Sequence, residues 1–277
     1  MPDAPSVDIR PLRSNDECHV AAAFQREIWG QDYADVVPAT VLHVVDYVGG
    51  LAAGAFDGSG EMLGFVFGVN GVRDGEIVHW SHMLGVRESA RNLGLGRRLK
   101  AYQRDTLGAI GVQRIFWTFD PLMAKNAYFN LDRLGAEVVE YVPDMYGTST
   151  SPLHLGLATD RLIVCLTTAP AGVESRRATV TASTPLLTVF PRLNDLTLSL
   201  DDRSPDAALI EIPGDMLEVL SRSPALARTW RLAVRDHFQW ALSRGYTIAG
   251  VHRDAASERS FYLIARRRAG APALAAD

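Results

Sequence analysis

Cysteine is scarce in this chain of 277 residues, which contains only Cys18 and Cys165. The two residues are far apart and form no C-x-x-C pair, so the sequence predicts neither a disulfide framework nor a thiolate metal site. We expect no bound metal. Isolated thiols are typical of a reducing compartment, and we therefore expect a cytoplasmic protein.

The chain also lacks an excess of positive charge. Its 28 Lys and Arg residues are outnumbered by 32 Asp and Glu residues, which gives a formal net charge of −4. A protein that binds nucleic acid through a basic surface needs the opposite balance. A short basic run, Arg266–Arg268, is therefore interpreted as the end of a charged tail. We expect no nucleic-acid partner.

Long apolar runs are absent as well. No stretch approaches the roughly 20 residues that a membrane-spanning helix needs. The first residues, MPDAPSVDIRPL, lack the charged-then-apolar layout of a secretory signal. Apolar residues nevertheless make up 47% of the chain and charged residues 22%. This balance is typical of a soluble globular protein, so we expect no membrane partner.

What the chain does contain is a strand, a glycine-bearing turn and a helix in direct succession within His79–Leu99. An apolar-rich run ends at Val86, and the turn Arg91–Gly96 then opens into a helical pattern. The first N–H groups of a helix have no intrahelical partner and lie at the positive end of its dipole. Gly94 and Gly96 lack the Cβ that would hold an anion away from these amides, so the turn predicts a pyrophosphate site. The arginines that would add positive charge there are Arg91, Arg97 and Arg98.

The spacing of the turn indicates which pyrophosphate it favours. The dinucleotide fingerprint G-x-G-x-x-G is absent, and Gly96 is followed by Arg97 rather than by the Lys-Ser/Thr of a phosphate-binding loop. What is present is R-x-x-G-x-G after a strand that ends L-G-V. This pattern resembles the acyl-CoA signature of the GNAT superfamily of N-acyltransferases. An ordinary strand-to-helix connection and a nucleotide-binding protein with a degenerate loop are the alternatives.

The resemblance implies acetyl-CoA or another acyl-CoA as co-substrate. In that family the loop amides hold the pyrophosphate, a role that would fall here to Asn92–Arg97. The preceding strand offers backbone groups to pantetheine, a role that would fall to Leu84 and Val86. The residues assigned to coenzyme A in this way are Leu84, Gly85, Val86, Arg91, Asn92, Leu93, Gly94, Leu95, Gly96, Arg97, Asn126 and Phe129.

The order of the predicted elements agrees with that fold. Strands are predicted at Ser6–Leu12, Leu51–Asp57, Glu61–Asn70, Glu76–Val86, Arg114–Phe119, Ala136–Tyr141 and Arg161–Thr167. Helices are predicted at Asp16–Trp29, Gly94–Gly108 and Asn126–Leu134, with a further short helix as one interpretation of Pro38–Val45. We therefore expect an α/β fold with a mixed (α+β) sheet, and a GNAT acyl-CoA-binding domain at 1–168.

The rest of the chain is expected to form a smaller C-terminal α/β extension. Residues 169–206 are rich in Thr, Ser, Pro and Ala, which indicates a linker or surface excursion, with weak β alternation near Thr184–Phe190. The extension proper, 207–277, has predicted strands at Ala207–Ile212, Tyr246–Val251 and Ser260–Arg266 and a long helix at Pro224–Arg244. The residues predicted along one side of that helix are Leu226, Trp230, Ala233, His237 and Trp240. We expect the extension to pack onto the first domain or onto a partner copy, which would make a homodimer.

His82 is the strongest candidate for a general base. It lies four residues before Val86 on the strand expected to line the thioester, and histidine titrates near neutral pH. Strand alternation places Glu76, Trp80 and Leu84 on the same face as His82, so Glu76 could do the same work if it is buried. In some amine acetyltransferases of the family a histidine occupies the matching position. The alternative for His82 is a core histidine bonded to backbone. His79, on the other face, is expected to be structural.

A second group of candidates follows the next predicted strand. In the family an asparagine near Asn126 contacts pantetheine, although this residue could simply cap a helix. The family's proposed acid is a tyrosine four residues before the helix-ending glycine, and counting back from Gly135 gives Leu131, which cannot donate a proton. Tyr128 and Tyr146 are the remaining candidates for that acid.

Other side chains have two interpretations each. Trp80, Trp117 and Phe119 could form walls of an acceptor pocket, or they could be core aromatics. Arg231 and Arg235 stand four residues apart on one helix face. They could clamp a substrate carboxylate, or they could form a solvated basic stripe.

The chain as a whole resembles a group of predicted GNAT acetyltransferases. Their features are a strand H-M-L-G-V, a segment W-T-F-D-P followed by N-A-Y, and a C-terminal extension; here the three motifs are His82–Val86, Trp117–Pro121 and Asn126–Tyr128. The resemblance implies transfer of an acetyl or succinyl group from CoA to the amine of a small molecule, for example an amino acid. No cysteine lies on the active-site strand, so we expect direct attack in a ternary complex. A non-enzymatic acyl-CoA sensor on the same fold is the competing hypothesis.

Overall fold

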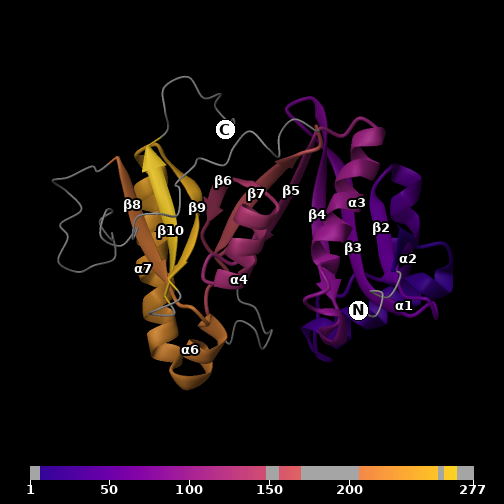
Figure 1. The fold of residues 1–277 in the computed structure, drawn as a ribbon, viewed down its shortest axis with the longest axis horizontal. Coiled ribbons are helices and arrows are strands. Elements are labelled where there is room, and N and C mark those ends of the chain that lie inside the picture. Colours follow the sequence, from indigo (N-terminus) through magenta and orange to yellow (C-terminus); the bar gives the residue numbers. More distant parts are fainter. Residues whose placement is uncertain (1–6, 148–155, 170–205, 255–258, 267–277) are drawn as a thin grey trace, which may run out of the picture. The chain divides into compact units, whose positions relative to one another are not determined.

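The structure is a computed structural model that describes residues 7–147, 156–169, 206–254 and 259–266 (Figure 1). These residues form two compact units. The first consists of the described parts of Met1–Trp117 and Leu166–Gly172, and the second of those of Thr118–Cys165 and Val173–Asp277.

The first unit contains a mixed sheet with helices. Its elements are β1 (Asp8–Pro11), α1 (Asn15–Trp29), α2 (Ala39–Val44), the 3₁₀ turn η1 (Val45–Val48), β2 (Leu51–Phe56), β3 (Met62–Arg73), β4 (Glu76–Val86), the 3₁₀ turn η2 (Glu88–Ala90), α3 (Leu95–Ala109) and most of β5 (Arg114–Phe119). The strand order is β1-β2-β3-β4-β5. The first four strands pair antiparallel, and β4 pairs parallel with β5. The predicted mixed α/β sheet is therefore confirmed.

Local chemistry sets several of these boundaries. The Ser14 hydroxyl accepts a hydrogen bond from the Glu17 amide at 3.2 Å and starts α1. The Asp57 carboxylate accepts from the amides of Ser59 and Glu61, both at 2.9 Å, and closes the turn between β2 and β3. Both side chains use short polar groups to satisfy amides that the adjoining helix or strand leaves unpaired.

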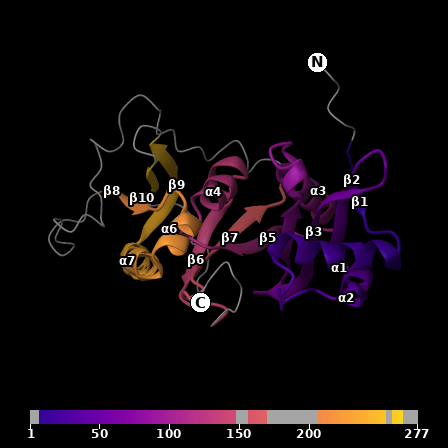
Figure 2. The same ribbon diagram turned by 90° about the horizontal axis from the view of Figure 1, so that it is seen from below.

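Helices cover both faces of this sheet, with α1 and α2 on one side and α3 on the other (Figure 2). On one face Phe24 of α1 and Leu42 of α2 share a core cluster with Phe65 of β3. On the opposite face Leu99 of α3 packs with Val66, the next residue of β3. Adjacent strand residues point to opposite faces, so one strand supplies both cores.

A β-bulge interrupts β4 at His82. Met83 pairs with Phe67 and Ser81 pairs with Gly68, so the partner strand has no residue opposite His82. An inserted residue of this kind bends the strand and changes which face the following side chains occupy.

The bulge corrects the predicted alternation along β4. Trp80 and His82 do share a face, since both line the same pocket on the α1–α2 side. Met83 lies on that side too, in the core formed with α1 and α2. Leu84 and Val86 instead pack in the core beneath α3. The prediction that Leu84 shares a face with His82 is therefore wrong, because the extra residue shifts the period by one.

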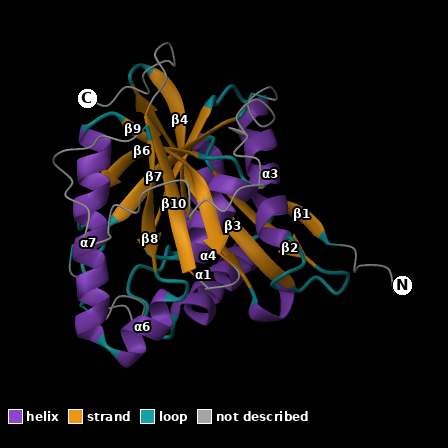
Figure 3. Cartoon of the chain, turned by 60° about the vertical axis from the view of Figure 1, so that its left-hand side comes forward, coloured by secondary structure: helices purple, strands orange, loops and turns teal. Residues whose placement is uncertain are grey.

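The second unit holds the rest of the described chain. Its elements are the end of β5, α4 (Ala124–Ala127), the π-helical turn η3 (Tyr128–Arg133), β6 (Glu137–Val142), most of β7 (Arg161–Thr167), β8 (Ala207–Ile212), α6 (Met216–Arg222), α7 (Pro224–Ser243), β9 (Tyr246–Asp254) and β10 (Arg259–Arg266). In this unit β7 lies between β5 and β6, and a separate antiparallel sheet has the order β8-β10-β9. The helices α6 and α7 follow one another beside these strands (Figure 3). No helix in the described ranges is long and apolar enough to cross a bilayer.

The C-terminal extension packs onto an earlier part of the same chain. Phe238 of α7 stacks on Tyr141 of β6 with ring centroids 5.4 Å apart, and it meets the edge of Tyr262 of β10 at 5.0 Å. The Tyr262 hydroxyl donates to the Pro121 carbonyl at 2.8 Å. The described residues thus show packing within one chain, and the homodimer stays a prediction.

The predicted domain boundaries do not coincide with the two units. The chain leaves the first unit after Trp117 and returns to it at Leu166, so the predicted domain 1–168 contributes to both. Apart from its two end residues, the predicted linker 169–206 lies outside the described residues, as do Arg267 and Arg268. The boundaries stay a prediction.

The buried face of α7 is displaced by one residue from the predicted one. The residues that it buries are Ala227, Arg231, Val234, Phe238 and Ala241. Hydrophobicity favoured the neighbouring stripe, in which Leu226 is in fact about half exposed. The buried face of α7 includes Arg231, whose guanidinium pairs with Asp120, a residue distant in sequence. We infer that this pair sets the orientation of the helix.

Candidate active site

The strands β4 and β5 part midway along β4. Parallel pairing joins Val78–Trp80 to Arg114–Phe116. Beyond these residues β4 has no strand partner on this edge within the described chain, although it continues to Val86. Strand pairing therefore leaves the backbone N–H and C=O groups of Ser81–Val86 on that edge unused, and a ligand with matching groups could pair with them. The same stretch includes the strand residues assigned to pantetheine.

The three strand residues assigned to coenzyme A can act only through their backbone. Leu84 and Val86 pack their side chains toward α3. Gly85 is buried, and a Cβ at this position would meet the Phe24 ring at 3.3 Å. Their main-chain groups, not their side chains, lie along the open edge of β4.

The turn after β4 leads into a helix that no side chain caps. Gly94 occupies the N-cap position of α3 with φ +72°, and Asn92 is left-handed too, with φ +70°. The short helices α2 and α4 also lack a side-chain cap, whereas α1, α6 and α7 each begin with one. The first backbone bond of α3 runs from the Arg98 amide to the Gly94 carbonyl at 3.1 Å. The amides that precede it, with no acceptor inside the helix, are those of Leu95, Gly96 and Arg97.

The charged side chains around this turn differ in their freedom. Arg91 is exposed and forms an ion pair with Glu88 at 3.7 Å, and Arg97 is exposed. Arg98, in contrast, donates to the Val7 carbonyl at 2.7 Å. Arg98 is therefore tied to the start of β1 and is not the mobile charge that its sequence position suggested. Leu93 is half exposed, whereas the Leu95 side chain is buried.

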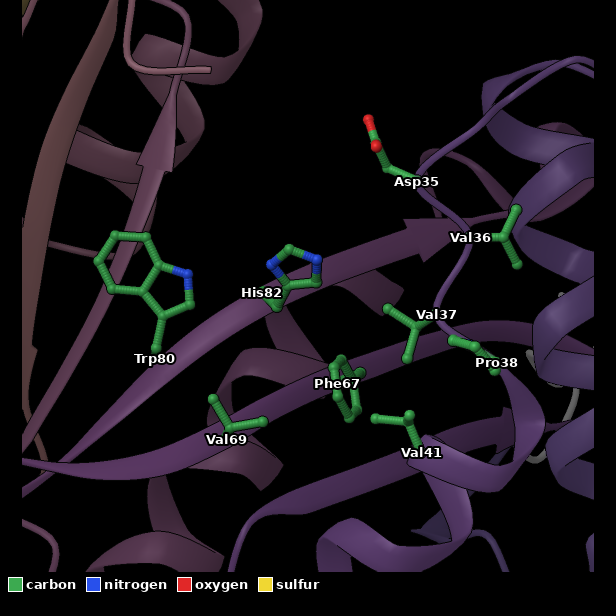
Figure 4. Close-up of a pocket in the computed structure, with 9 residues that line it drawn as sticks. All are labelled: Asp35, Val36, Val37, Pro38, Val41, Phe67, Val69, Trp80 and His82. Atoms are coloured by element: carbon green, nitrogen blue, oxygen red, sulfur yellow. The ribbon is translucent and has the colours of Figure 1, made fainter. Parts of the chain in front are cut away.

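His82 opens onto a pocket of about 410 Å³ in the first unit (Figure 4). The walls come from the α1–α2 loop, α2, β3 and β4. The lining residues are Asp35, Val36, Val37, Pro38, Val41, Phe67, Val69, Trp80 and His82. The predicted role of Trp80 as a wall agrees with this geometry, whereas Trp117 and Phe119 are buried core aromatics.

The surroundings of His82 favour its neutral form. Its ring meets Phe67 edge to face, with centroids 6.1 Å apart. The residue is exposed at the pocket mouth, yet the apolar walls keep water from part of the ring. This desolvation lowers the pKa of His82 below its usual 6.5, and the Asp35 carboxylate partly opposes the shift. A neutral imidazole at neutral pH can accept a proton, as a general base must.

A buried glutamine fixes the loop that carries Asp35. The Gln25 side chain of α1 accepts from the Val37 amide at 2.7 Å and donates to the Val37 carbonyl at 3.1 Å. Both residues are buried. One side chain thus satisfies both backbone groups of a loop residue that has no strand partner, which holds the pocket wall in place.

Gln25→Leu is expected to destabilise the protein by about 2–6 kcal/mol. The leucine fills similar space but leaves the Val37 amide and carbonyl buried without partners, and each such group costs about 1–3 kcal/mol. Urea denaturation measures the free energy of unfolding. The matched control is Gln239→Leu on the exposed side of α7. Equal stability of the two variants would contradict this role.

His79, three residues before His82, is a core histidine. It is fully buried, with Nδ1 2.7 Å from Asn70 Oδ1 and Nε2 3.0 Å from Gln103 Nε2. Burial, together with the nearby Lys100 charge, lowers the pKa of His79 to about 3, so the ring is neutral. These contacts agree with the structural interpretation of this residue.

The hydrogen-bonded side chains around His79 include a buried lysine beneath α3. Lys100 Nζ donates to Ser81 Oγ at 2.7 Å and to Gln103 Oε1 at 3.1 Å, and it lies 4.0 Å from the Trp117 ring centroid. Burial lowers the pKa of Lys100 to about 7. These groups occupy the face of β4 opposite the pocket.

The proposed role for Glu76 required burial, and the structure corrects it. Glu76 is exposed at the first residue of β4 and accepts from Arg114 at 2.9 Å. His82 lies six positions further along, about 20 Å away on an extended strand. Glu76 therefore does not share the work of His82.

The remaining candidates lie in the second unit. Asn126 is exposed and is the third residue of α4, whose N-cap is Met123, so the interpretation of Asn126 as a helix cap is wrong. Tyr128 begins η3 about half exposed, with the Arg133 guanidinium 5.4 Å from its ring centroid. Phe129 follows and is partly buried.

Tyr146 is half exposed and lies close to the end of β5. Its hydroxyl is 3.2 Å from Thr118 Oγ1, and the Arg161 guanidinium lies 5.3 Å from its ring centroid. The hydroxyl is thus ordered and accessible within the second unit, and its role as an acid stays a prediction.

Neither arginine of α7 is available to a substrate carboxylate. Arg231 holds the Asp120 carboxylate through two hydrogen bonds, and its side chain is only 3% exposed. Arg235 holds Asp160 in the same two-pronged way. Both interpretations of this pair, a carboxylate clamp and a solvated basic stripe, are therefore wrong.

The Asp160 carboxylate, which Arg235 holds, is fully buried and stays ionised. Burial alone would raise the pKa of Asp160, but hydrogen bonds from Arg235, from the Tyr141 hydroxyl and from the Asp144 amide lower it on balance. No group of three His, Cys, Asp or Glu residues arranged to hold a metal ion occurs in the described ranges.

Comparison with known proteins gives matches of structure alone. No family model matches the chain, and no curated protein matches its sequence. The ribosomal-protein-S18-alanine N-acetyltransferase from Escherichia coli is 18% identical over 61% of this chain and 98% of its own, with a TM-score of 0.46. An acetyltransferase of the GNAT family from Streptococcus pneumoniae is 14% identical over 58% and 99%, with a TM-score of 0.47.

A third solved structure, the NatC complex bound to Gag peptide and CoA, is 14% identical over 58% of this chain and 98% of its own, with a TM-score of 0.45. The chain is similar to acetyltransferases of the GNAT family. This likeness concerns the fold, so substrate and mechanism depend on the residues of the chain itself.

Proposed function

We propose that this protein is an acyl-CoA-dependent N-acyltransferase that moves an acetyl or succinyl group to the amine of a small molecule by direct attack. The bulge at His82 is the observation that carries the proposal. It presents an imidazole to a pocket at the point where β4 loses its partner on one edge.

Two features of the first unit fit an acyl-CoA. The open edge of β4 at Ser81–Val86 offers alternating N–H and C=O groups, which suit the amide groups of a pantetheine arm. The uncapped start of α3 offers the amides of Leu95–Arg97 and the positive end of the helix dipole, which suit a diphosphate. A side-chain hydroxyl or carboxylate bonded to these amides would occupy the position of the diphosphate, and no side chain caps α3.

The chemistry would need one proton acceptor in the protein. Coenzyme A supplies an acyl group activated as a thioester. His82, neutral at pH 7, takes a proton from the bound ammonium so that the nitrogen lone pair becomes free to attack. An N–C bond then forms while the C–S bond breaks. The nitrogen gives up a second proton as it becomes an amide, and the sulfur takes up one proton to leave as a thiol. Tyr128 and Tyr146 are the candidates for delivering that proton.

Arg97→Glu is expected to weaken binding of acetyl-CoA by roughly tenfold, because it places a carboxylate where the diphosphate would lie. Titration calorimetry at two salt concentrations measures the effect, which should shrink as salt screens the charges. Arg228→Glu, on the exposed side of α7, makes the same change in net charge and serves as the control. If both variants bind acetyl-CoA equally well, the diphosphate does not sit at this turn.

A further inference from the structure

The pocket beside His82 combines one negative charge with apolar walls. Two of its lining residues, Asp35 and His82, carry titratable groups, and the others are apolar or aromatic. Figure 4 shows the two polar side chains on one side of the pocket, with Val41, Phe67 and Val69 on the other. A matching ligand has one polar end and an apolar body.

Two of the apolar wall residues are unusually open to solvent. Val41 is 44% exposed and Val69 is 38% exposed, and they come from α2 and β3 respectively. A hydrocarbon group that covered both would remove apolar surface from water, which is favourable. The walls therefore favour an acceptor whose body is hydrocarbon rather than polar.

The charge of the pocket discriminates between amines. Asp35 attracts an ammonium group, and no Lys or Arg is among the described residues that line the pocket. A carboxylate on the acceptor would lose water, find no cation in the pocket wall and face the Asp35 carboxylate. Arg231 and Arg235, which could have provided a clamp elsewhere, already hold Asp120 and Asp160.

We infer that the acceptor is a primary amine with an apolar body and no carboxylate beside its nitrogen, and that Asp35 binds its ammonium group. The inference rests on the proposed function and names its substrate class. It replaces the expectation of an amino acid, because the described wall residues supply a counter-charge for an amine but none for a carboxylate.

Matched pairs of compounds test this directly. Each amine is compared with the amino acid that differs from it only by a carboxylate: phenethylamine with phenylalanine, and pentylamine with norleucine. With acetyl-CoA as donor, we expect kcat/KM to be at least about 100-fold higher for each amine. Among linear alkylamines, KM should fall about fourfold per added CH₂ until the pocket is filled. Calorimetric titration of phenethylamine into the CoA-saturated protein gives binding independently of turnover.

Two carboxylate variants from the same loop identify the anchor. Asp35→Asn should raise KM for phenethylamine about tenfold or more. It should also reduce the ratio of kcat/KM for phenethylamine to that for phenylalanine, because Asp35 no longer repels the carboxylate of phenylalanine. Asp32→Asn removes an exposed carboxylate that does not line the pocket. It should leave KM for phenethylamine, and the kcat/KM ratio of phenethylamine to phenylalanine, within about twofold of the wild-type values. Equal effects of the two variants would overturn the role of Asp35.

The outcomes separate this inference from the proposed function. Turnover of amino acids as fast as of their amines overturns the inference and leaves the acyltransferase standing. Amines that bind but are never acylated overturn the acyltransferase and leave the pocket's preference intact. Amines that neither bind nor react overturn the inference.

Discussion

Replacing His82 by alanine is expected to lower kcat about 100- to 10,000-fold, with little change in affinity for acetyl-CoA. The imidazole is the neutral base at the pocket mouth, and loss of a general base typically has this effect. CoA release measured across a panel of amines gives kcat, and calorimetry gives the affinity. His43→Ala on the exposed surface of α2 is the matched control, because that histidine does not line the pocket.

The same variant separates an enzyme from a sensor. If the wild-type protein binds acetyl-CoA but acylates no amine of the panel, the protein is a sensor on this fold, and His82→Ala has no turnover to lose. If turnover exists and survives the substitution, His82 is not the base.

The pH profile adds a check that a purely structural histidine would not meet. Protonation of His82 removes its ability to accept a proton, so kcat/KM should fall as the pH drops through its pKa. Desolvation lowers that pKa, so the midpoint should lie below 6.5. The Asp35 carboxylate raises the pKa of His82, and Asp35→Asn should therefore move the acidic limb to still lower pH.

Arg231→Met is expected to destabilise the second unit by about 3 kcal/mol or more. It leaves the Asp120 carboxylate, itself 11% exposed, without its closest cation. Breaking one partner of a buried pair costs about 3–5 kcal/mol, and we expect the lower part of this range because Arg161 lies 3.7 Å away. Urea denaturation gives the free energy of unfolding.

A double variant shows whether the loss comes from the stranded carboxylate. Asp120→Asn combined with Arg231→Met removes both charges and should recover part of the stability. Arg228→Met, an exposed position on the same helix, should change stability by about 0.5 kcal/mol at most. A cost for Arg231→Met no larger than that of the Arg228 control would show that the pair does not hold α7 in place.

Sequence periodicity located β4 correctly and failed within it. The boundaries Glu76–Val86 follow from apolar content and turn signals, and the structure has the same limits. The bulge at His82 has no local signal, because it depends on how β3 pairs across the sheet. Alternation therefore placed Trp80 and His82 correctly together but assigned Leu84 to the wrong face.

The pocket could not be found from sequence for a similar reason. Asp35 lies in a loop without any motif. It lines the same pocket as His82, and Gln25 of α1 holds that loop through Val37. The loop after α1 must fold against β4, which comes much later in the chain, before the carboxylate and the imidazole share one opening. Likewise, nothing local to α7 shows that Arg231 has Asp120 as its partner.

By itself, the sequence determined the mixed α/β character, the strand–turn–helix unit with its glycine turn, and His82 as the histidine to test. Those features depend on local periodicity, turn chemistry and spacing, which a linear chain records directly. Only the tertiary structure decided the face of each β4 side chain, the orientation of α7 and the charge of the pocket. These depend on cross-strand register and on buried charge pairing, and both are set by residues far apart in the chain.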